Sequence, residues 1–156
     1  PSAFRIDAQG GWRFVRMPLL RSAESYTMDG KAAVAKPNST LPFKDAGALL
    51  KFHYPSTWNH FLADHAILFR VTPISATETE VCTKWLVHKD AVEGKDYTLD
   101  RVMTVWSRTN EQDWQIVENQ QIGVTSTRYQ PGPFSRSRET NVAHFDEWYL
   151  SEVSRT

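Results

Sequence analysis

The strongest constraint on the fold is a change in hydrophobic period across a charged loop at residues 90–96. Before this loop, short apolar or alternating runs have the pattern of β-strands. After it, from Thr98 or Asp100 to about Gln121, apolar residues recur every three or four positions, which places them on one face of a helix. The pattern predicts an α+β fold, an antiparallel β-sheet with a long helix packed on it.

Four segments have the composition of strands, and they lie at Trp12–Arg16, Ala48–Tyr54, Ala66–Pro73 and Thr79–His88. In the first, large apolar residues alternate with basic ones, as in a half-buried strand. The last two are separated by a short polar turn, so we expect them to form an antiparallel hairpin. Asp29-Gly30 predicts a turn, and two prolines with Asn38-Ser39-Thr40 predict a surface loop over residues 36–44.

The end of the chain has helical character again. Gly123 is a natural stop for the long helix, and Pro131-Gly132-Pro133 predicts a loop over residues 124–138. A last helix is expected over Thr140–Val153. Its apolar side would comprise Val142, Phe145, Trp148 and Tyr149.

Charge and cysteine content exclude several classes of protein. Basic and acidic residues balance at 18 each, which argues against a nucleic-acid binder. No apolar run reaches the ~18–20 residues that a membrane span needs. Cys82 is the only cysteine, so there is no internal disulfide and no cysteine metal cage, and a cytoplasmic location is the default expectation. The start Pro-Ser-Ala-Phe-Arg has neither an initiator Met nor a signal-peptide pattern, so we expect a fragment or a processed chain.

Asp113 is the most informative polar residue, because it interrupts the apolar stripe of the long helix. A buried carboxylate has to be paired, protonated or bound to a metal ion. An ordinary salt bridge to a neighbouring Arg or Lys is the alternative. Asn110 lies one turn earlier on nearly the same face, which favours a site. The stripe consists of Val102, Trp106, Thr109, Asp113, Ile116, Val117 and Gln120.

The stretch from Thr109 to Ser135 resembles the C-terminal signature of Rieske-type non-haem iron oxygenase large subunits. That signature has an Asp early in a helix, a Glu, a Gln and a helix-ending Gly, then a Ser, an aromatic residue and Gly-Pro. Its counterparts here are Asp113, Glu118, Gln121, Gly123, Ser126, Tyr129, Gly132-Pro133, Phe134 and Ser135. The likeness continues into the last helix through Glu139, and it extends more weakly to Arg16–Leu20 and Arg70–Ile74.

The resemblance implies a helix-grip (START-like) catalytic domain, of which residues 1–156 would be the C-terminal part. In this family two His and one carboxylate hold a mononuclear Fe(II), and the open face binds dioxygen. Asp113 takes the carboxylate role by resemblance. The two His would lie upstream of this chain. The Rieske [2Fe-2S] domain, which needs two Cys and two His, would lie further upstream and be absent here.

Other titratable residues have more ordinary interpretations. His60 and His65 have a metal-ligand spacing, but Thr57 stands where the family motif has an acid, so we expect one His in a turn and the other at a strand start. Glu118 points away from Asp113 and is expected to form a salt bridge or a subunit contact. Cys82 is expected to be an inert core thiol. His53, His88 and His144 are expected to be structural or exposed.

Residues 21–30 and 51–58 resemble the branch of this family that acts on quaternary ammonium compounds, such as glycine betaine and stachydrine demethylases. The reaction there is oxygen insertion into an N-methyl C–H bond, followed by loss of formaldehyde. Because a quaternary ammonium group donates no hydrogen bond, aromatic faces have to hold it. Tyr54, Trp58 and Phe69 are the candidates, although each is equally consistent with an ordinary core aromatic. A substrate carboxylate would need an Arg or a backbone N–H group, which the sequence does not assign.

Three rivals remain open: an aromatic-ring hydroxylating dioxygenase, a non-enzymatic helix-grip domain that binds a small molecule, and a proteolytic remnant with no activity of its own. For the oxygenase, the resemblance implies a small-molecule substrate, O2, a flavin- and iron–sulfur-containing reductase and a homotrimer in the full-length protein. It implies neither nucleic acid nor membrane as a partner.

Overall fold

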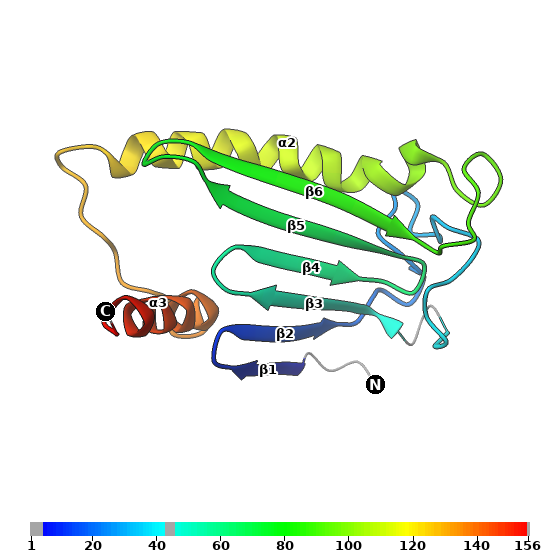
Figure 1. The fold of residues 1–156 in the computed structure, drawn as a ribbon, viewed down its shortest axis with the longest axis horizontal. Helices are drawn as coiled ribbons and strands as arrows, with labels where there is room; N and C mark the ends of the chain where they lie inside the picture. The colour runs from blue at the N-terminus through cyan, green and yellow to red at the C-terminus, as the bar shows by residue number, and fades with distance from the viewer. Residues whose placement is uncertain (1–4, 43–45, 156) are drawn as a thin grey trace. The chain divides into compact units, whose positions relative to one another are not determined.

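The computed structural model describes residues 5–42 and 46–155. Its strands form one antiparallel sheet in the order β1-β2-β3-β4-β5-β6, so each strand pairs with its neighbour in the chain (Figure 1). The strands are β1 (Arg5–Gln9), β2 (Trp12–Met17), β3 (Ala48–His53), β4 (Thr57–Phe61), β5 (His65–Pro73) and β6 (Thr79–Val87). The helices are α2 (Leu99–Val124) and α3 (Thr140–Val153). This is the predicted α+β class.

The predicted strands are confirmed to within one residue at either end, and so is the hairpin, in which Ile67 of β5 pairs with Trp85 of β6. The expected loop at 36–44 lacks helix and strand over residues 36–42, and its last two residues lie outside the described part of the chain. The predicted location of His60 was wrong. His60 lies within β4, between Leu50 of β3 and Ile67 of β5, rather than in a turn. His65 does begin a strand, as expected.

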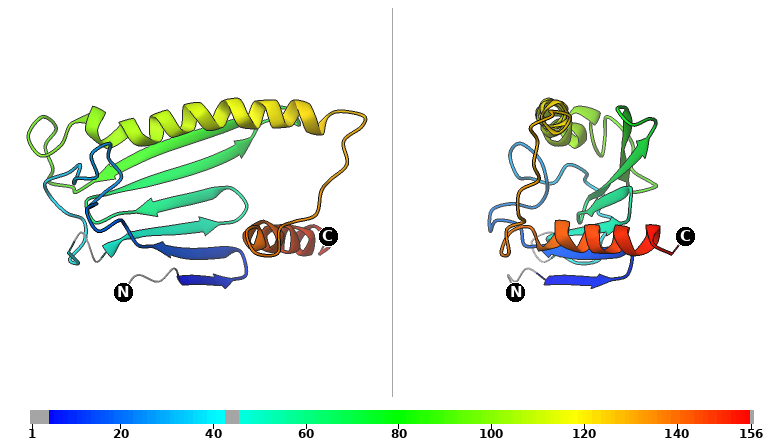
Figure 2. Two further views of the ribbon diagram at one scale, coloured as in Figure 1. Left: turned by 180° about the vertical axis from the view of Figure 1, so that it is seen from behind. Right: turned by 90° about the vertical axis from the view of Figure 1, so that its left-hand side faces the viewer.

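The two faces of the sheet differ sharply in burial, because side chains of successive strand residues point to opposite sides. We call the buried side the inner face. The view from behind shows the same order of strands along the meander (Figure 2). The buried inner-face residues of β2 to β5 are Arg13, Val15, Ala48, Leu50, His60, His65, Ile67 and Phe69. On the opposite face Leu49, Phe61 and Leu86 are exposed.

Two apolar clusters hold the sheet to the segments around it. Val15 and Leu50 pack with Leu62, and Tyr26 from the long β2–β3 connection packs against them. Val102, in the first turns of α2, forms a second cluster with Ala33 and Val34 of the same connection. Trp85 and Val87 of β6 pack on this second cluster. The cluster and the residues packed against it are Ala33, Val34, Val102, Trp85, Val87, Ala91 and Tyr97. The start of the long helix is therefore anchored against the last strand.

The long helix begins where predicted and ends slightly later. The Thr98 hydroxyl accepts a hydrogen bond from the Arg101 N–H at 3.4 Å, so Thr98 rather than Asp100 caps the helix. Gly123 does not stop the helix, which continues to Val124. In the described residues, no helix is both long and apolar enough to cross a membrane.

The chain divides into two compact units, one up to Val105 and one from Trp106 onward. The second unit holds the rest of α2 and the predicted last helix, α3. Within α3 the Phe145 ring stacks with Tyr149 at 6.3 Å and contacts Trp148 at 5.9 Å, so the predicted aromatic side exists. The Ser135 N–H donates to the Glu139 carboxylate at 2.6 Å just before this helix.

Candidate functional site

The strand register aligns four inner-face residues across the sheet. Arg13 pairs with Phe52, Phe52 with Trp58, and Trp58 with Phe69, so β2, β3, β4 and β5 contribute one residue each. We call these four residues the inner row. Neighbouring strands lie about 4.8 Å apart, so each member of the inner row is one such step from the next. A cation thus stands at one end of a line of aromatic rings.

The aromatic end of the inner row is a stacked pair. The Trp58 and Phe69 rings lie 5.0 Å apart, centroid to centroid, with their planes only 10° from parallel. Phe69 is 1% exposed, and the His60 ring lies 5.6 Å from it at a tilt. Tyr26 in turn meets His60 edge-on at 6.0 Å. Two of the three aromatics proposed from the sequence are therefore brought into direct contact.

Tyr54, the third predicted aromatic, follows β3 and lies near the cationic end. Its N–H donates to the Gly11 carbonyl at 2.7 Å. Burial raises the pKa of Tyr54, and the positive charge of Arg13 acts in the opposite direction, which shows that the guanidinium lies within electrostatic reach of the phenol.

Arg13 was not identified from the sequence. The alternation in Trp12–Arg16 correctly predicts a strand, but Arg13 and Val15 are its buried residues, whereas Trp12 and Phe14 are only half-buried. Arg13 is 8% exposed, and its Nε and Nη1 atoms have no hydrogen-bond partner among the described residues. The burial of Arg13 could have been inferred from its spacing to Val15. Residues two apart in a strand point to the same face, so Arg13 lies on the same buried face as Val15.

A buried hydrogen-bond network around Asp64 links the β2–β3 connection to the start of β5. The Ser25 hydroxyl donates to Asp64 Oδ1 at 2.7 Å, and the Ala33 N–H donates to Asp64 Oδ2 at 2.7 Å. His65 Nδ1 lies 3.0 Å from Asp64 Oδ1. Burial acts to raise the pKa of Asp64, but hydrogen bonds from His65, Ser25 and Ala33 outweigh it and the pKa is lowered. An ionised Asp64 is an acceptor only, so in the contact with His65 the Nδ1 atom has to be the donor.

The two histidines with metal-ligand spacing have separate surroundings. His60 packs among aromatic rings, whereas His65 is bonded to Asp64 and its Nε2 has no partner among the described residues. Among the side chains that the structure describes, those of residues 10–42 and 46–155, no three of His, Cys, Asp or Glu gather as a set that could hold a metal ion. Cys82 is half-buried in β6 rather than in the core.

Asp113 lies on α2 in the second unit. The structure corrects the expectation that it is buried within this chain: Asp113 is exposed, as is Glu118. The apolar neighbours Trp114, Ile116 and Val117 are at least half exposed too. The predicted stripe is therefore buried at Val102 but exposed from Asp113 onward. Asn110 is half-buried one turn earlier. The carboxylate of Asp113 makes no hydrogen bond or ion pair with the described residues, so its oxygens are free to bind a cation.

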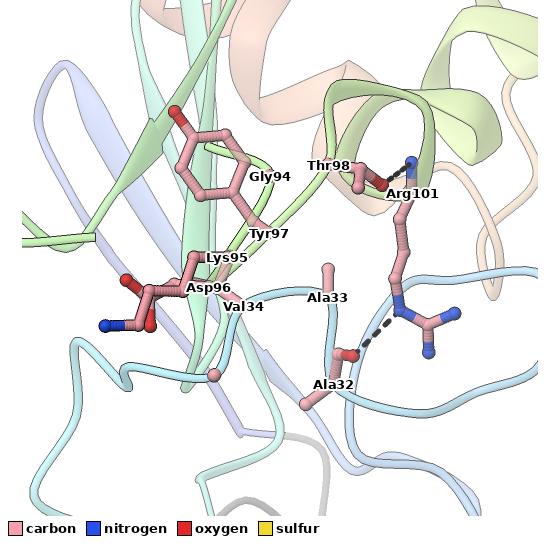
Figure 3. Close-up of a pocket in the computed structure, with 10 residues that line it drawn as sticks. Ala32, Ala33, Val34, Gly94, Lys95, Asp96, Tyr97, Thr98 and Arg101 are labelled. Atoms are coloured by element: carbon pink, nitrogen blue, oxygen red, sulfur yellow. Dashed lines mark hydrogen bonds between the residues drawn. The ribbon is translucent and has the colours of Figure 1, made fainter. Parts of the chain in front are cut away.

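A pocket of about 280 Å³ lies between residues 32–35 and 94–101 (Figure 3). Arg101 crosses it, donating from Nε to the Ala32 carbonyl at 3.1 Å and binding both oxygens of Asp29 at 3.0 and 3.1 Å. Lys36 pairs with Asp96 at 3.1 Å. Because these charged groups already satisfy one another, and no predicted site residue lines the pocket, we assign it a structural role.

Residues 2–155, nearly the whole chain, match the ring hydroxylating alpha subunit (catalytic domain) family. The chain belongs to this family. Among curated members, it is 50% identical over 141 residues to the glycine betaine monooxygenase oxygenase subunits of two Pseudomonas aeruginosa strains. It is 46% identical over 137 residues to the subunit of the same name from Chromohalobacter salexigens.

These alignments cover 90% and 88% of this ring hydroxylating alpha subunit chain, but only 33% and 31% of the relatives. The chain thus spans about a third of the length of the curated relatives that it matches. The family predicted from the stretch Thr109 to Ser135 is confirmed, and the similarity to glycine betaine subunits agrees with the predicted branch.

Proposed function

We propose that this chain is the C-terminal part of the catalytic domain of a Rieske-type oxygenase subunit that N-demethylates a quaternary ammonium compound such as glycine betaine. The observation that carries the proposal is the 50% identity to glycine betaine monooxygenase oxygenase subunits over 90% of the chain. Family membership over residues 2–155 supports the oxygenase class. The remaining two thirds of such a subunit would supply the Rieske domain and the rest of the active site.

The inner row supports a cationic substrate. A quaternary ammonium group offers no N–H donor, so its recognition depends on aromatic faces. The stacked Trp58–Phe69 pair provides such faces, and Trp58 is only half-buried, which leaves part of its surface accessible. Tyr54 lies at the other end, beside Arg13. We assign Trp58 and Phe69 to the methyl groups, and Tyr54 to the opposite end of the site.

Asp113 fits the carboxylate position of a mononuclear iron site. Its oxygens are not engaged by any described residue, and carboxylate oxygen is a suitable ligand for Fe(II) alongside two His. When bound, the iron would supply the activation of O2 for oxidation of a C–H bond. Asp113 would hold one coordination position by its charge, and Asn110 would steady it from one turn earlier. The two His and the [2Fe-2S] ligands belong to the part of the subunit outside this chain.

The proposed oxidation balances with O2, two electrons and two protons: one oxygen atom enters a methyl C–H bond and the other leaves as water. The hydroxymethyl ammonium then breaks its C–N bond and releases formaldehyde, the tertiary amine and one proton. The electrons would come from a flavin- and iron–sulfur-containing reductase. We further propose that the full-length subunit works as a homotrimer in the cytoplasm.

The test uses the full-length subunit, loaded with iron and cluster and supplied with a reductase. We expect formaldehyde to appear with glycine betaine in step with O2 consumption. Trp58→Leu should raise KM for glycine betaine about tenfold, since a desolvated cation–π contact is worth up to about 2 kcal/mol. Trp12→Leu, on the opposite face of the sheet, is the matched control and should leave KM unchanged. Ring-hydroxylated product from an aromatic acid, with no formaldehyde from any quaternary amine, would overturn the proposal.

A further inference from the structure

The guanidinium of Arg13 is a buried cation without a counter-ion among the side chains of residues 10–42 and 46–155. The residue is 8% exposed, and both Nε and Nη1 are shielded from solvent without a hydrogen-bond partner. Arg does not lose its proton in proteins, so it cannot relieve the burial by becoming neutral. A buried charge is normally paired, and an unpaired one is strongly unfavourable. The arrangement therefore calls for an anion that the described residues do not provide.

The shape of the Arg13 guanidinium favours a carboxylate as the anion. The flat fork of N–H donors on a guanidinium matches the two oxygens of a carboxylate, and such charge-assisted bonds are the stronger ones in proteins. Two other basic residues of this unit already have a carboxylate partner: Arg101 binds Asp29, and Lys36 binds Asp96. Arg13 thus differs from these two in having unused donors on the inner face.

The position of Arg13 in the inner row sets the geometry of the ligand. Trp58 lies two strands away, about 10 Å between backbones, and the long Arg side chain can shorten that gap. A small zwitterion can then meet aromatic rings with its cation and the guanidinium with its anion. The reverse orientation would bring the ammonium against the Arg13 charge and is excluded by like-charge repulsion.

We propose that Arg13 binds the substrate carboxylate and, with the Trp58–Phe69 stack, selects a zwitterionic quaternary ammonium compound over a simple cation. This inference rests on the proposed function and assigns the anionic end of the same site. Arg13 is a substrate-binding residue in this scheme and takes no part in the oxidation.

The experiment compares two ligands in the full-length, iron-loaded enzyme with its reductase. Glycine betaine carries both charges, whereas tetramethylammonium has the cation alone and serves as a competitive inhibitor. In Arg13→Gln we expect KM for glycine betaine to rise about 10- to 100-fold, as for loss of a hydrogen-bonded ion pair. Ki for tetramethylammonium should stay within about twofold of wild type. A change of about twofold is smaller than the loss of one hydrogen-bonded ion pair would cause. Arg13→Lys should recover part of the affinity.

Arg70→Gln is the matched control, because Arg70 lies on β5 of the same sheet, faces the opposite side and is exposed. It should change neither constant. An unchanged KM for glycine betaine in Arg13→Gln, or an equal loss of affinity for both ligands, would overturn the inference while leaving the proposed function standing. A wild-type enzyme that demethylates no quaternary amine would instead defeat the proposed function, and this inference with it.

If Arg13→Gln does not fold, as judged by circular dichroism, the inference can be tested on the wild-type enzyme by comparing the binding of two ligands. The methyl ester of glycine betaine keeps the cation and lacks the anion. Binding of the ester at least about tenfold weaker than binding of glycine betaine supports the role of Arg13, since one such ion pair is worth about that factor. Equal binding of the two would overturn it.

Discussion

Ser25 and Asp64 are 39 residues apart in the chain, yet their side chains share a buried hydrogen bond of 2.7 Å. Asp64 is fully buried and also accepts from the Ala33 N–H, so it fastens the β2–β3 connection to the start of β5. Asp64→Asn removes the charge and turns one acceptor into a donor facing other donors. We expect a loss of about 3 kcal/mol in the free energy of unfolding, measured by urea denaturation. Asp90→Asn, at an exposed site, should cost less than about 1 kcal/mol.

The charge on Asp64 also predicts a dependence of stability on acid. Since the folded pKa lies below the ordinary value of 3.8, the stabilisation is complete above pH 3.8 and is lost as the pH falls through the folded pKa. Unfolding free energy should decline more steeply below pH 3.8 in the wild type than in Asp64→Asn. Parallel curves for the two proteins would contradict this.

His60 governs a different pH range. Burial lowers the pKa of His60 to about 4 from its ordinary 6.5, so the folded protein keeps the ring neutral where the unfolded chain protonates it. Stability is therefore unaffected above pH 6.5, falls by at most about 1.4 kcal/mol per pH unit below it, and levels off near pH 4. His60→Gln should flatten this slope. If the unfolding free energy of His60→Gln keeps the same dependence on pH, another titratable group causes that dependence.

Asp113 gives the sharpest test of the iron site. We expect Asp113→Ala in the full-length subunit to lose the mononuclear iron and to retain cluster iron and sulfide, as measured by metal and sulfide analysis. Activity should fall more than about 100-fold, beyond what loss of an outer-shell partner causes. Glu118→Gln, also exposed on α2, is the control and should keep both metals. Full iron content in Asp113→Ala would exclude the ligand role.

Alanine substitutions at Gly47 and Gly94, which both have positive φ, allow the cost of steric crowding to be distinguished from the cost of backbone strain. Gly47 has φ +67°, and a Cβ there would lie 2.6 Å from the Met17 carbonyl oxygen, whereas Gly94 has φ +79° and open space. We expect Gly94→Ala to cost about 1–2 kcal/mol and Gly47→Ala to cost at least about 1 kcal/mol more, measured by thermal unfolding. Equal losses would mean that the Met17 backbone moves away without penalty.

The sequence predicted those features that have a local signal. β5 and β6 are long runs with strand composition, and the period of α2 extends over many turns, so both were placed closely. β4 was missed as a strand because Thr57, Asn59 and His60 give it a polar composition, and its pairing with both neighbours overrides that composition.

The site was less accessible from the sequence because its parts meet through register and long-range contacts. Trp58 and Phe69 were proposed from chemistry, but their stacking depends on the β4–β5 register. Arg13 was overlooked because basic residues usually face solvent. The bond between Ser25 and Asp64 has no signal in a single sequence. The exposure of Asp113 was not predicted, because the helical period places it on the apolar stripe and a period alone does not show which part of a stripe is covered.

The inner row also bears on how ligand choice can evolve. Each of its four members comes from a different strand, so a single codon change replaces one member while the backbone positions of the other three stay fixed. An inserted or deleted residue within β3 or β4 would have the opposite effect, because a slip of one residue sends every later side chain of that strand to the other face. Homologues with new substrates should therefore differ at positions 13, 52, 58 and 69 while keeping the lengths of these strands unchanged.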